Sequence, residues 1–547
     1  AGRERRDELG QAVGELERRS RHLHRRRLPE GLRTPRPALV FGRAHPYVPF
    51  FVSPLAASFH RSTSPQLEEL ALPVELEGSL PAWLSGSYFR NGPGKLDAEG
   101  TPYAHPFDGD GMLVRIEFEA GRVRYQNRYV RTRELEEERA LGRMLYRGFG
   151  TNLPGGLLRN LFRTRFKNAA NTSVVLHGGR LLALWEGGLP HALDPRTLTT
   201  LGRFDFDGSL QNDAGLFDRL LAPELPFSAH PKLDPRDGTL HNFGTAYGRK
   251  NRLYVYEIDR EGRMQTKRAV ELPRMSFVHD FVLTERHRVF FLVPVSFDVA
   301  RAVVGLRSPA ASLRAEEGPT ELLVVDRHTG EAQKLDAPAC FAFHHANGYD
   351  DGAAIVVDSC RSDSMPSAGD AERAIRGEPV ELSPARLTRF RVELGEGRVT
   401  ETRLFEHPVE LPTIHPGAVS RRHRYVYALA ARPEHTEPFL PGLGRFDVER
   451  GEATLLDLGE DLPAEPLFVP RPGSRDEAEG VVLSLVYRAR EHATDLLVLD
   501  AQRLEERARV RMPHHVPPGF HGCFVPSSGA AVAPRSEERR VGKECRS

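Results

Sequence analysis

A hairpin pattern recurs seven times along the chain, between about residues 112 and 513. Each copy is an alternating apolar run, a short turn with Gly or an Asp/Thr pair, and a second alternating run. Alternation of apolar and polar residues is typical of a half-buried strand, and a short turn between two such runs joins them into a hairpin. The seven copies begin at Leu113, His191, Leu253, Leu322, Leu387, Gly444 and Leu496.

The spacing of these hairpins indicates a repeat architecture. Equivalent positions in successive copies are 53 to 78 residues apart, which leaves room for one small sheet per repeat. Seven four-stranded sheets arranged radially form a seven-bladed β-propeller, which has only short, protected sheet edges. Two packed β-sandwich domains are the alternative, but no linker rich in Pro, Gly and Ser divides the chain. We therefore expect an all-β, seven-bladed β-propeller.

Three segments interrupt the strand pattern. Residues 133–149 and 153–166 are typical of helices or helical turns, and residues 296–318 form a long excursion. On a propeller, such insertions collect on one face and cover the mouth of the axial channel. Because loops on a rigid frame often carry chemistry, we expect a helical and loop dome over the face that holds the site.

The domain organisation follows from these patterns. We expect one propeller domain at 51–534 and a basic, partly disordered N-terminal extension at 1–50. The last residues, 535–547, read RSEERRVGKECRS and have no apolar periodicity. They resemble a translated sequencing adapter, so we expect a non-native tail.

The composition excludes several classes of protein. The chain has 76 Lys and Arg against 75 Asp and Glu, so it has no general attraction for nucleic acid. Its four cysteines form no C-x-x-C pair, which favours a reducing, cytoplasmic setting. No apolar run reaches 18 residues. No dinucleotide-binding, nucleophile-elbow or Walker motif occurs, so we expect no nucleotide cofactor.

Four of the 22 histidines lie beside strand-like apolar runs, in PFSAHPKLDP, SFVHDFVL, CFAFHHANGYDD and GFHGCFVP. A lone histidine is usually a surface or satisfied core residue. The innermost strand of each blade faces the propeller axis, however, so one histidine from each of four blades can converge there. The four are His230, His279, His344 and His521. An all-imidazole set suits Zn, Cu, Fe or Ni, and an octahedral iron would keep two free positions; the residues alone leave the metal open.

Nine stretches then appear in one consistent order from about residue 54 to residue 526. They are SYFRNGP, HPFDGDGM, FKNAANTSVV, LALWEGGLPHALDP, FSAHPKLDP, FVHDFVLTE, FHHANGYDD, EPLFV and GFHG. With them the chain resembles the carotenoid cleavage oxygenase family. The resemblance implies a seven-bladed propeller with a helical dome, in agreement with the hairpins. It also implies one Fe(II) per chain held by the four histidines, with O2 as co-substrate for cleavage of a conjugated double bond into two carbonyl products.

The resemblance also assigns roles to individual residues. The family motif F-H-x-x-N begins here at Phe343, so His344 is expected as the ligand rather than the adjacent His345. Thr172, in the AANT segment, matches a family threonine whose methyl group lies near the open iron position. It is expected to restrict one coordination position and to help aim dioxygen.

Three glutamates are expected behind the histidines, at Glu186, Glu410 and Glu465. In the family, such glutamates accept hydrogen bonds from the outer nitrogens of three ligands, here those of His279, His344 and His521. Partners of this kind fix the tautomer and orientation of an imidazole and raise its basicity. Two of the three lie in apolar, strand-like runs, where an unpaired charge would be costly.

Substrate preference depends on finer signs. FGTNLPGG, together with FKNAANT and LWEGGLPHALDP, is most similar to bacterial apocarotenoid oxygenases. This implies a hydrophobic polyene substrate and retinal-type apocarotenal products. The stilbene-cleaving branch has a lysine shortly after a V-R-T stretch, where this chain has Glu134, and an acidic residue would repel a phenolate.

Several alternatives stay open. Cleavage of stilbenes or lignin fragments is the first within the family, and retinoid isomerisation without oxygen is more distant. A calcium-dependent propeller lactonase or hydrolase would need oxygen ligands at the axis rather than imidazoles. A non-enzymatic propeller scaffold would bind no metal.

One segment combines apolar residues with arginines, as in a patch that rests in a bilayer interface. Its apolar residues are Leu157, Leu158, Leu161, Phe162 and Phe166, and its arginines are Arg159, Arg163 and Arg165. A helix packed on the propeller is the alternative. We expect a cytoplasmic protein that can associate peripherally with a membrane surface.

Overall fold

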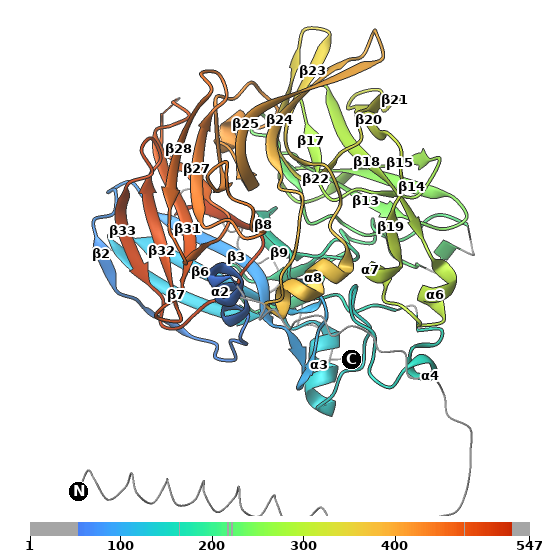
Figure 1. The fold of residues 1–547 in the computed structure, drawn as a ribbon, viewed down its shortest axis with the longest axis horizontal. Helices are drawn as coiled ribbons and strands as arrows, with labels where there is room; N and C mark the ends of the chain where they lie inside the picture. Colours follow the sequence, from blue (N-terminus) through green and yellow to red (C-terminus); the bar gives the residue numbers. More distant parts are fainter. Residues whose placement is uncertain (1–52, 164, 216–217, 220–221, 475, 528–547) are drawn as a thin grey trace, which may run out of the picture. The chain divides into compact units, whose positions relative to one another are not determined.

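The computed structural model describes residues 53–527, except 164, 216–217, 220–221 and 475. The N-terminal extension expected at 1–50 and the tail expected at 535–547 lie outside these residues. Within them, small antiparallel sheets follow one another around a ring (Figure 1). The prediction of an all-β, seven-bladed propeller is confirmed.

The first three blades follow the chain order of their hairpins. Blade 1 contains, across its sheet, β1 (Ala71–Pro73), β7 (Arg122–Tyr129), β6 (Asp110–Glu119), β3 (Gly86–Lys95) and β34 (Gly522–Pro526). Blade 2 contains β11 (Thr200–Arg203), β10 (His191–Leu193), β9 (Arg180–Leu184) and β8 (Ser173–His177). Blade 3 contains β12 (Lys232–Leu233), β13 (Leu240–Ala246), β14 (Asn251–Ile258) and β15 (Met264–Leu272).

The other four blades complete the ring. Blade 4 contains β16 (Ser276–Phe277), β17 (Phe281–Leu283), β18 (His287–Phe297), β19 (Leu313–Ala315), β20 (Thr320–Asp326) and β21 (Ala332–Ala337). Blade 5 contains β22 (Phe341–Asp351), β23 (Ala354–Ser362), β24 (Arg386–Glu393) and the first half of β25 (Arg398–Thr413). Blade 6 contains the second half of β25, then β26 (Tyr425–Ala430), β27 (Gly442–Asp447) and β28 (Glu452–Asp457). Blade 7 contains β2 (Leu76–Gly78), β33 (Glu506–Arg511), β32 (Ala493–Asp500), β31 (Gly480–Arg488), β29 (Leu462–Pro463) and β30 (Leu467–Pro470).

Blades 5 and 6 share one strand. β25 pairs with β24 through its first half and with β26 through its second half. The pairing with β24 extends to Pro408 and the pairing with β26 starts at Val409, so the strand passes from one blade into the next at these two residues. The two blades therefore form one continuous seven-stranded sheet.

Both ends of the described chain close the ring. β34 adds to β3 in blade 1, with Phe89 opposite Cys523. β2 adds to β33 in blade 7, with Glu77 opposite Arg509. An early strand thus completes the last blade and the last strand completes the first. This mutual exchange ties blades 1 and 7 together without a covalent link.

The hydrophobic core is divided into layers between neighbouring blades. Seven clusters of buried side chains each draw on two adjacent blades, so that every blade-to-blade interface around the ring has one. Strand β18 shows the cause. Phe290 and Leu292 pack toward blade 3, whereas Val289 and Phe291 pack toward blade 5. Because successive side chains of a strand point to opposite faces, a central strand supplies both interfaces.

Helices gather beside the blades and form the expected dome (Figure 1). They are α2 (Pro54–Ser62), α3 (Arg133–Leu141), α4 (Leu157–Asn160), α6 (Val299–Val303), α7 (Pro309–Ser312) and α8 (Ala368–Ile375). Two 3₁₀ turns, η1 (Pro106–Asp108) and η2 (Pro416–Ala418), and a small hairpin of β4 (Asp97–Ala98) and β5 (Thr101–Pro102) complete the elements. The three insertions expected from the sequence supply α3, α4, α6 and α7, whereas α2 and α8 are additional. None of the helices in the described part of the chain combines the length and apolar composition needed to cross a bilayer.

Candidate metal centre

Four histidines converge at the axis of the propeller. One ring nitrogen from each of His230, His279, His344 and His521 lies within 4.8 Å of the others. His230 comes just before β12, His279 lies between β16 and β17, His344 lies in β22, and His521 comes just before β34. These strands are the inner edges of blades 3, 4, 5 and 1. The structure thus brings together all four of the histidines singled out in the sequence.

The rings face one another closely. The ring centroid of His230 lies 4.3 Å from that of His279, 4.6 Å from that of His521 and 5.2 Å from that of His344. Nε2 of His230 and Nε2 of His344 are buried and have no hydrogen-bond partner in the described part of the chain. Buried polar atoms normally have hydrogen-bond partners. Two buried ring nitrogens that face a shared centre and have no such partner are suited to bind a metal ion there.

The ionisation of His230 fits the same role. Burial, with smaller contributions from the three neighbouring imidazoles, holds the pKa of His230 well below its ordinary value. The ring is therefore neutral near pH 7 and keeps a free lone pair. Because a histidine must be deprotonated to bind a metal, this imidazole is prepared for coordination.

Each of the three expected glutamates contacts one of these rings. Nδ1 of His344 lies 2.6 Å from Oε2 of Glu410, and Nδ1 of His521 lies 2.8 Å from Oε1 of Glu465. Nδ1 of His279 contacts Oε1 of Glu186. A carboxylate at Nδ1 fixes the proton there and leaves Nε2 as the acceptor that faces the centre.

The seven side chains come from seven different blades. The histidines belong to blades 3, 4, 5 and 1, and the glutamates lie in blades 2, 6 and 7. Glu410 lies in the half of β25 that pairs with blade 6, where it faces Leu429. Every blade therefore contributes one side chain to the centre or to its surrounding carboxylates, so the spacing of the rings depends on the whole ring of blades.

The adjacent histidines of FHHAN point in different directions. The register of β22 shifts on both sides of His345, whose Nδ1 lies 2.7 Å from Oγ of Ser359. The ring of His345 packs against Phe291 with a centroid distance of 4.6 Å. The ring of His344 instead faces the other three histidines. The strand irregularity thus separates the two neighbours.

Thr172 lies beside the segment that carries His521. Its carbonyl oxygen accepts a hydrogen bond of 3.1 Å from the backbone N–H of His521. Its hydroxyl donates to Oδ1 of Asn171 over 3.1 Å, and the residue is buried. Thr172 is therefore held rigidly next to one of the four histidines.

Three charged residues near the centre were not foreseen. Arg90, fully buried in β3, donates from Nη1 to Oε2 of Glu465 over 2.7 Å. Lys232 and Asp280 form an ion pair of 2.8 Å next to the histidine segments. For Arg90 and Asp280 the available signal is a charge within a strand-like apolar run, because a buried charge requires a partner. The identity of the partner depends on three-dimensional contacts.

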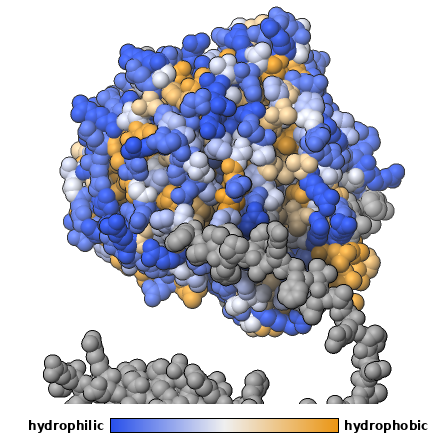
Figure 2. All heavy atoms as spheres, viewed as in Figure 1, coloured by the Kyte–Doolittle hydropathy of each residue, from blue (hydrophilic) through white to orange (hydrophobic). Residues whose placement is uncertain are grey.

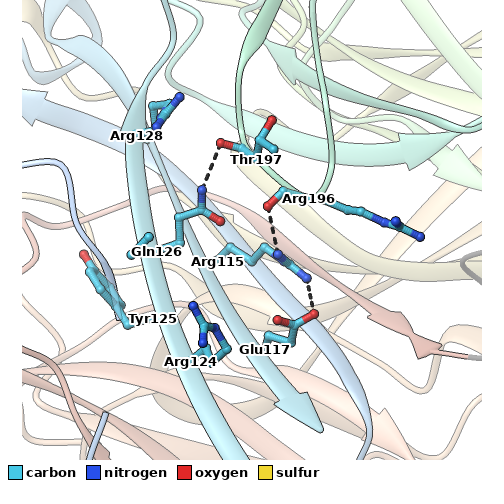
Figure 3. A pocket seen from close by; sticks show the side chains of 9 residues that line it. Arg115, Glu117, Arg124, Tyr125, Gln126, Arg128, Arg196 and Thr197 are labelled. Carbon is cyan, nitrogen blue, oxygen red and sulfur yellow. Dashed lines mark hydrogen bonds and ion pairs between the residues drawn. The ribbon is translucent and has the colours of Figure 1, made fainter. Parts of the chain in front are cut away.

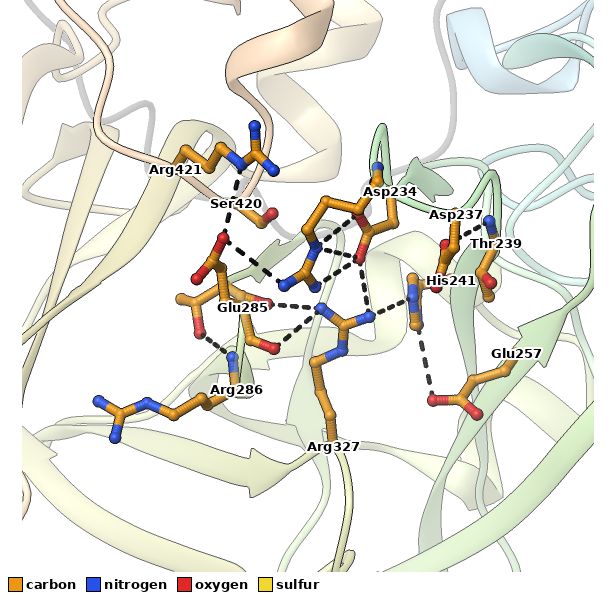
Figure 4. Close-up of polar contacts among 12 residues, drawn as sticks. Asp234, Asp237, Thr239, His241, Glu257, Glu285, Arg286, Arg327, Ser420 and Arg421 are labelled. Atoms are coloured by element: carbon orange, nitrogen blue, oxygen red, sulfur yellow. Dashed lines mark hydrogen bonds and ion pairs between the residues drawn. The ribbon is translucent and has the colours of Figure 1, made fainter.

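A second polar network holds the far end of the segment that carries His230. Asp234 accepts hydrogen bonds from Arg236 and, at 2.9 Å, from Nη2 of Arg327 (Figure 4). The same Arg327 nitrogen lies 2.9 Å from Nε2 of His241. These contacts anchor the residues around β12 to blade 4, because Arg327 follows β20.

An apolar cavity of about 320 Å³ lies behind His344. Part of its wall is formed by Phe343, which precedes His344 in the chain, and by Glu410, whose carboxylate contacts the ring of His344. At another part of the wall, the rings of Phe59 in α2 and Phe439 stack with centroids 4.5 Å apart. The volume lies at the low end of the range for small-molecule sites. A mainly apolar cavity that reaches the partner of one imidazole suits a hydrocarbon substrate.

Another pocket, of about 300 Å³, has a different character. It lies between the outer strands of blade 1 and the turn that joins β10 to β11 in blade 2, and it is lined by Arg115, Arg124, Arg128 and Arg196 (Figure 3). Arg115 is held by Glu117 and by the carbonyl oxygen of Arg196 at 2.9 Å. Its arginines do not suit an apolar ligand, and none of its lining residues contacts the four histidines or their glutamates. The histidine centre is therefore the better candidate site.

Some apolar residues of the 153–166 segment are exposed to solvent and others are half-buried. Leu158 is 87% and Phe162 73% exposed, and Leu157 is also exposed. Leu161 and Phe166 are half-buried, with Arg147 stacked over the ring of Phe166 at 5.4 Å. An apolar area on the side of α4 is visible in Figure 2. Leu306, 61% exposed, lies three residues after Val303, whose carbonyl accepts from the N–H of Phe162.

Comparison with known proteins adds to this geometry. The family model described as retinal pigment epithelial membrane protein, RPE65, matches residues 63–526. The chain is 35% identical over 464 residues to the apocarotenoid-15,15'-oxygenase of Synechocystis sp., covering 82% of this chain and 92% of that protein. It is 30% identical over 481 residues to the isoeugenol monooxygenase of Pseudomonas putida, covering 84% and 95%. The crystal structure of the cobalt-substituted Synechocystis enzyme superposes with a TM-score of 0.81 at 34% identity, covering 86% of this chain and 99% of that one.

Proposed function

Because this chain belongs to the RPE65/carotenoid oxygenase family, we propose that it is an Fe(II)-dependent dioxygenase that cleaves a conjugated double bond of an apocarotenoid. The two products are carbonyl compounds, among them a retinal-type apocarotenal. The observation that carries the proposal is the convergence of four imidazoles with three carboxylates behind them.

The donor set fits iron. Four neutral imidazoles suit a borderline divalent metal, and an octahedral ion held by four of them keeps two positions for small molecules. Calcium would require oxygen ligands, whereas the group of candidate ligands found among the described residues consists of histidines. When bound, Fe(II) would supply the binding and activation of O2.

The protein's own residues would do the positioning. Glu186, Glu410 and Glu465 hold protons at the outer nitrogens of three rings, so that the inner nitrogens stay free for coordination. Thr172 would narrow the space beside His521 and help to aim dioxygen. No side chain is required as general acid or base in this account.

The apolar cavity would hold the polyene. Its wall would exclude water and place one double bond beside the centre, which is an effect of orientation rather than of acid–base chemistry. The balance of the reaction is simple: the carbon–carbon double bond breaks and each of its carbons gains one oxygen atom of O2. No external reductant is needed.

The apocarotenoid substrate is favoured over a phenylpropanoid or stilbene. The higher identity is to an apocarotenoid oxygenase, although an isoeugenol monooxygenase is also related. Glu134, at the position where the stilbene-cleaving branch has a lysine, is buried in α3, 3.9 Å from Arg165, and supplies no cation for a phenolate. Cleavage of an alkenyl phenol by the same centre is the second candidate.

Product analysis separates these two candidates. Protein purified without oxygen and loaded with Fe(II) is incubated in air with an apocarotenal, with resveratrol or with isoeugenol, and the products are separated by chromatography. We expect two carbonyl products from the apocarotenal and slow or no turnover of the phenols. Turnover of resveratrol or isoeugenol without turnover of the apocarotenal would support the second candidate function. If none of the three compounds is cleaved, the proposal is contradicted.

Peripheral contact with a membrane would give the enzyme access to its substrate. The exposed side chains of Leu157, Leu158 and Phe162 stand beside the exposed Arg159 and Arg163, a combination suited to an anionic bilayer interface. Such contact is compatible with a cytoplasmic protein.

A further inference from the structure

One carboxylate ties together three of the four segments that carry the histidines. Asp280 directly follows His279 in the chain. Its Oδ1 contacts Nζ of Lys232 at 2.8 Å, and Lys232 lies two residues after His230. Its Oδ2 accepts a hydrogen bond of 3.1 Å from the backbone N–H of His345, the neighbour of His344. The side chain of Asp280 is almost completely buried, at 2% exposure.

His230 is the ring that needs such support. The other three histidines contact Glu186, Glu410 or Glu465, whereas no carboxylate in the described part of the chain contacts the ring of His230. Its strand, β12, is only two residues long and offers little backbone pairing. Asp234 fixes the far end of this segment through Arg327. Lys232 links this segment to Asp280, which directly follows His279 and accepts from the N–H next to His344.

The charges around the centre point to a divalent cation. Four carboxylates lie next to the rings or their segments, those of Glu186, Glu410, Glu465 and Asp280. Two cations accompany them, Arg90 at Glu465 and Lys232 at Asp280. Because imidazoles that bind a metal are neutral, these groups together carry two net negative charges, the complement of a doubly charged metal ion.

We propose that Asp280, paired with Lys232, is a positioning residue of the metal centre that fixes the segment of His230 relative to those of His279 and His344. This inference rests on the proposed function, because it assumes that the four histidines bind a metal. A site must hold its ligands within about 0.5 Å of the productive geometry. A single buried carboxylate with partners on neighbouring segments imposes such a constraint.

The pair can be tested by metal binding rather than by turnover. Asp280→Asn keeps the shape and removes the charge, Lys232→Met removes the ammonium group, and Lys232→Arg restores a cation. Asp358→Asn is the matched control, because Asp358 is also buried and the partners of its carboxylate are Arg389, at 2.7 Å, and His423 rather than any of the four histidines or their segments. The apo proteins are titrated with Co(II) alone and with Fe(II) alone under anaerobic conditions. The dissociation constant, the Co(II) ligand-field spectrum and the apo-protein Tm are recorded.

We expect Asp280→Asn to weaken Co(II) and Fe(II) binding by about 10- to 100-fold, the usual cost of losing an outer partner of a metal ligand, and to alter the Co(II) spectrum. Lys232→Met should do the same to a smaller extent, and Lys232→Arg should restore most of the affinity. Asp358→Asn should lower the Tm without changing either metal readout.

Two results would overturn the inference. One is wild-type affinity and an unchanged Co(II) spectrum in both Asp280→Asn and Lys232→Met, even if their Tm falls as in Asp358→Asn. The other is loss of affinity in Lys232→Arg equal to that in Lys232→Met. If Asp280→Asn does not fold, the two lysine variants decide, because the side chain of Lys232 is 25% exposed. Failure of the wild-type protein to bind either metal would instead contradict the proposed function.

Discussion

Oε2 of Glu410 lies 2.6 Å from Nδ1 of His344, and the two residues belong to neighbouring blades joined by the single strand β25. Blade 6 therefore sets the orientation of a ring that blade 5 carries. The same relationship recurs between Glu465 of blade 7 and His521 at the edge of blade 1. The centre is assembled across blade interfaces rather than within one blade.

Removal of the charge on Glu410 is expected to weaken the centre without unfolding the protein. Glu410→Gln retains an acceptor for Nδ1 of His344 but loses the negative charge, and we expect about tenfold weaker Fe(II) binding, with up to 100-fold for Glu410→Ala. Glu406→Gln is the control, because Glu406 is exposed on the same strand. Metal titration followed by elemental analysis measures the effect. Equal affinities of Glu410→Gln and Glu406→Gln would contradict the assignment.

The two adjacent histidines are expected to behave differently. His344→Ala removes a ring that faces the centre, and we expect loss of stoichiometric iron with little change in Tm. His345→Ala removes a buried hydrogen bond of 2.7 Å to Ser359, which we expect to cost roughly 1–3 kcal/mol of unfolding free energy while iron is retained. Iron content and urea unfolding distinguish the two variants. Loss of iron in His345→Ala together with retained iron in His344→Ala would show that His345, rather than His344, is the ligand.

Much of the fold could be predicted because its information is local. Alternation in the hairpins, as in β7, where exposed or half-buried residues alternate with buried ones, directly encodes which residues face the core. The shared strand β25 and the closing strands β2 and β34 could not be recognised in this way. β2 has only three residues, too few for a periodic signal. β34 lies in a strand-like stretch, but the partners of both strands lie hundreds of residues away.

In the candidate site, too, some residues could be identified from local sequence and others could not. His230, His279, His344 and His521 could be chosen because each lies next to a strand-like run within a distinctive stretch. Arg90, Lys232 and Asp280 could not, because the importance of a charged residue depends on which distant group it contacts. The contact of His345 with Ser359 depends on a register shift in β22 that cannot be predicted from the sequence.

Acid stability offers a test of the buried pairs in blade 5. Burial by itself raises the pKa of Asp358, but hydrogen bonds from Arg389 and His423 outweigh it and hold the pKa below its ordinary value. A carboxylate whose folded pKa is depressed stabilises the fold above its unfolded pKa, about 3.9. This contribution is lost as the pH falls through the folded value.

We therefore expect Asp358→Asn to lower the unfolding free energy by roughly 3 kcal/mol at pH 7, with a difference from wild type that shrinks below about pH 4. Urea unfolding at a series of pH values measures the difference. A difference that stays constant or grows toward low pH would mean that the charge of Asp358 is not the stabilising feature.

The exposed apolar residues near α4 give a prediction about membranes. At low salt, the wild-type protein is expected to sediment with vesicles that contain phosphatidylserine. The double variant Leu158→Glu/Phe162→Glu should bind at least about tenfold less, because it loses apolar contact and adds repulsion. Leu201→Glu is the control, since Leu201 is 60% exposed on β11 in blade 2. Absence of wild-type binding, or an equal loss in the control, would remove the membrane proposal.

The central claim is that four imidazoles from four blades hold one iron. Elemental analysis of protein purified without oxygen tests it most directly, with His279→Ala measured in parallel. The account predicts about one iron per chain in the wild-type protein and a large loss of iron in His279→Ala. Zinc alone or no metal in the wild type, or full iron content in His279→Ala, would contradict it.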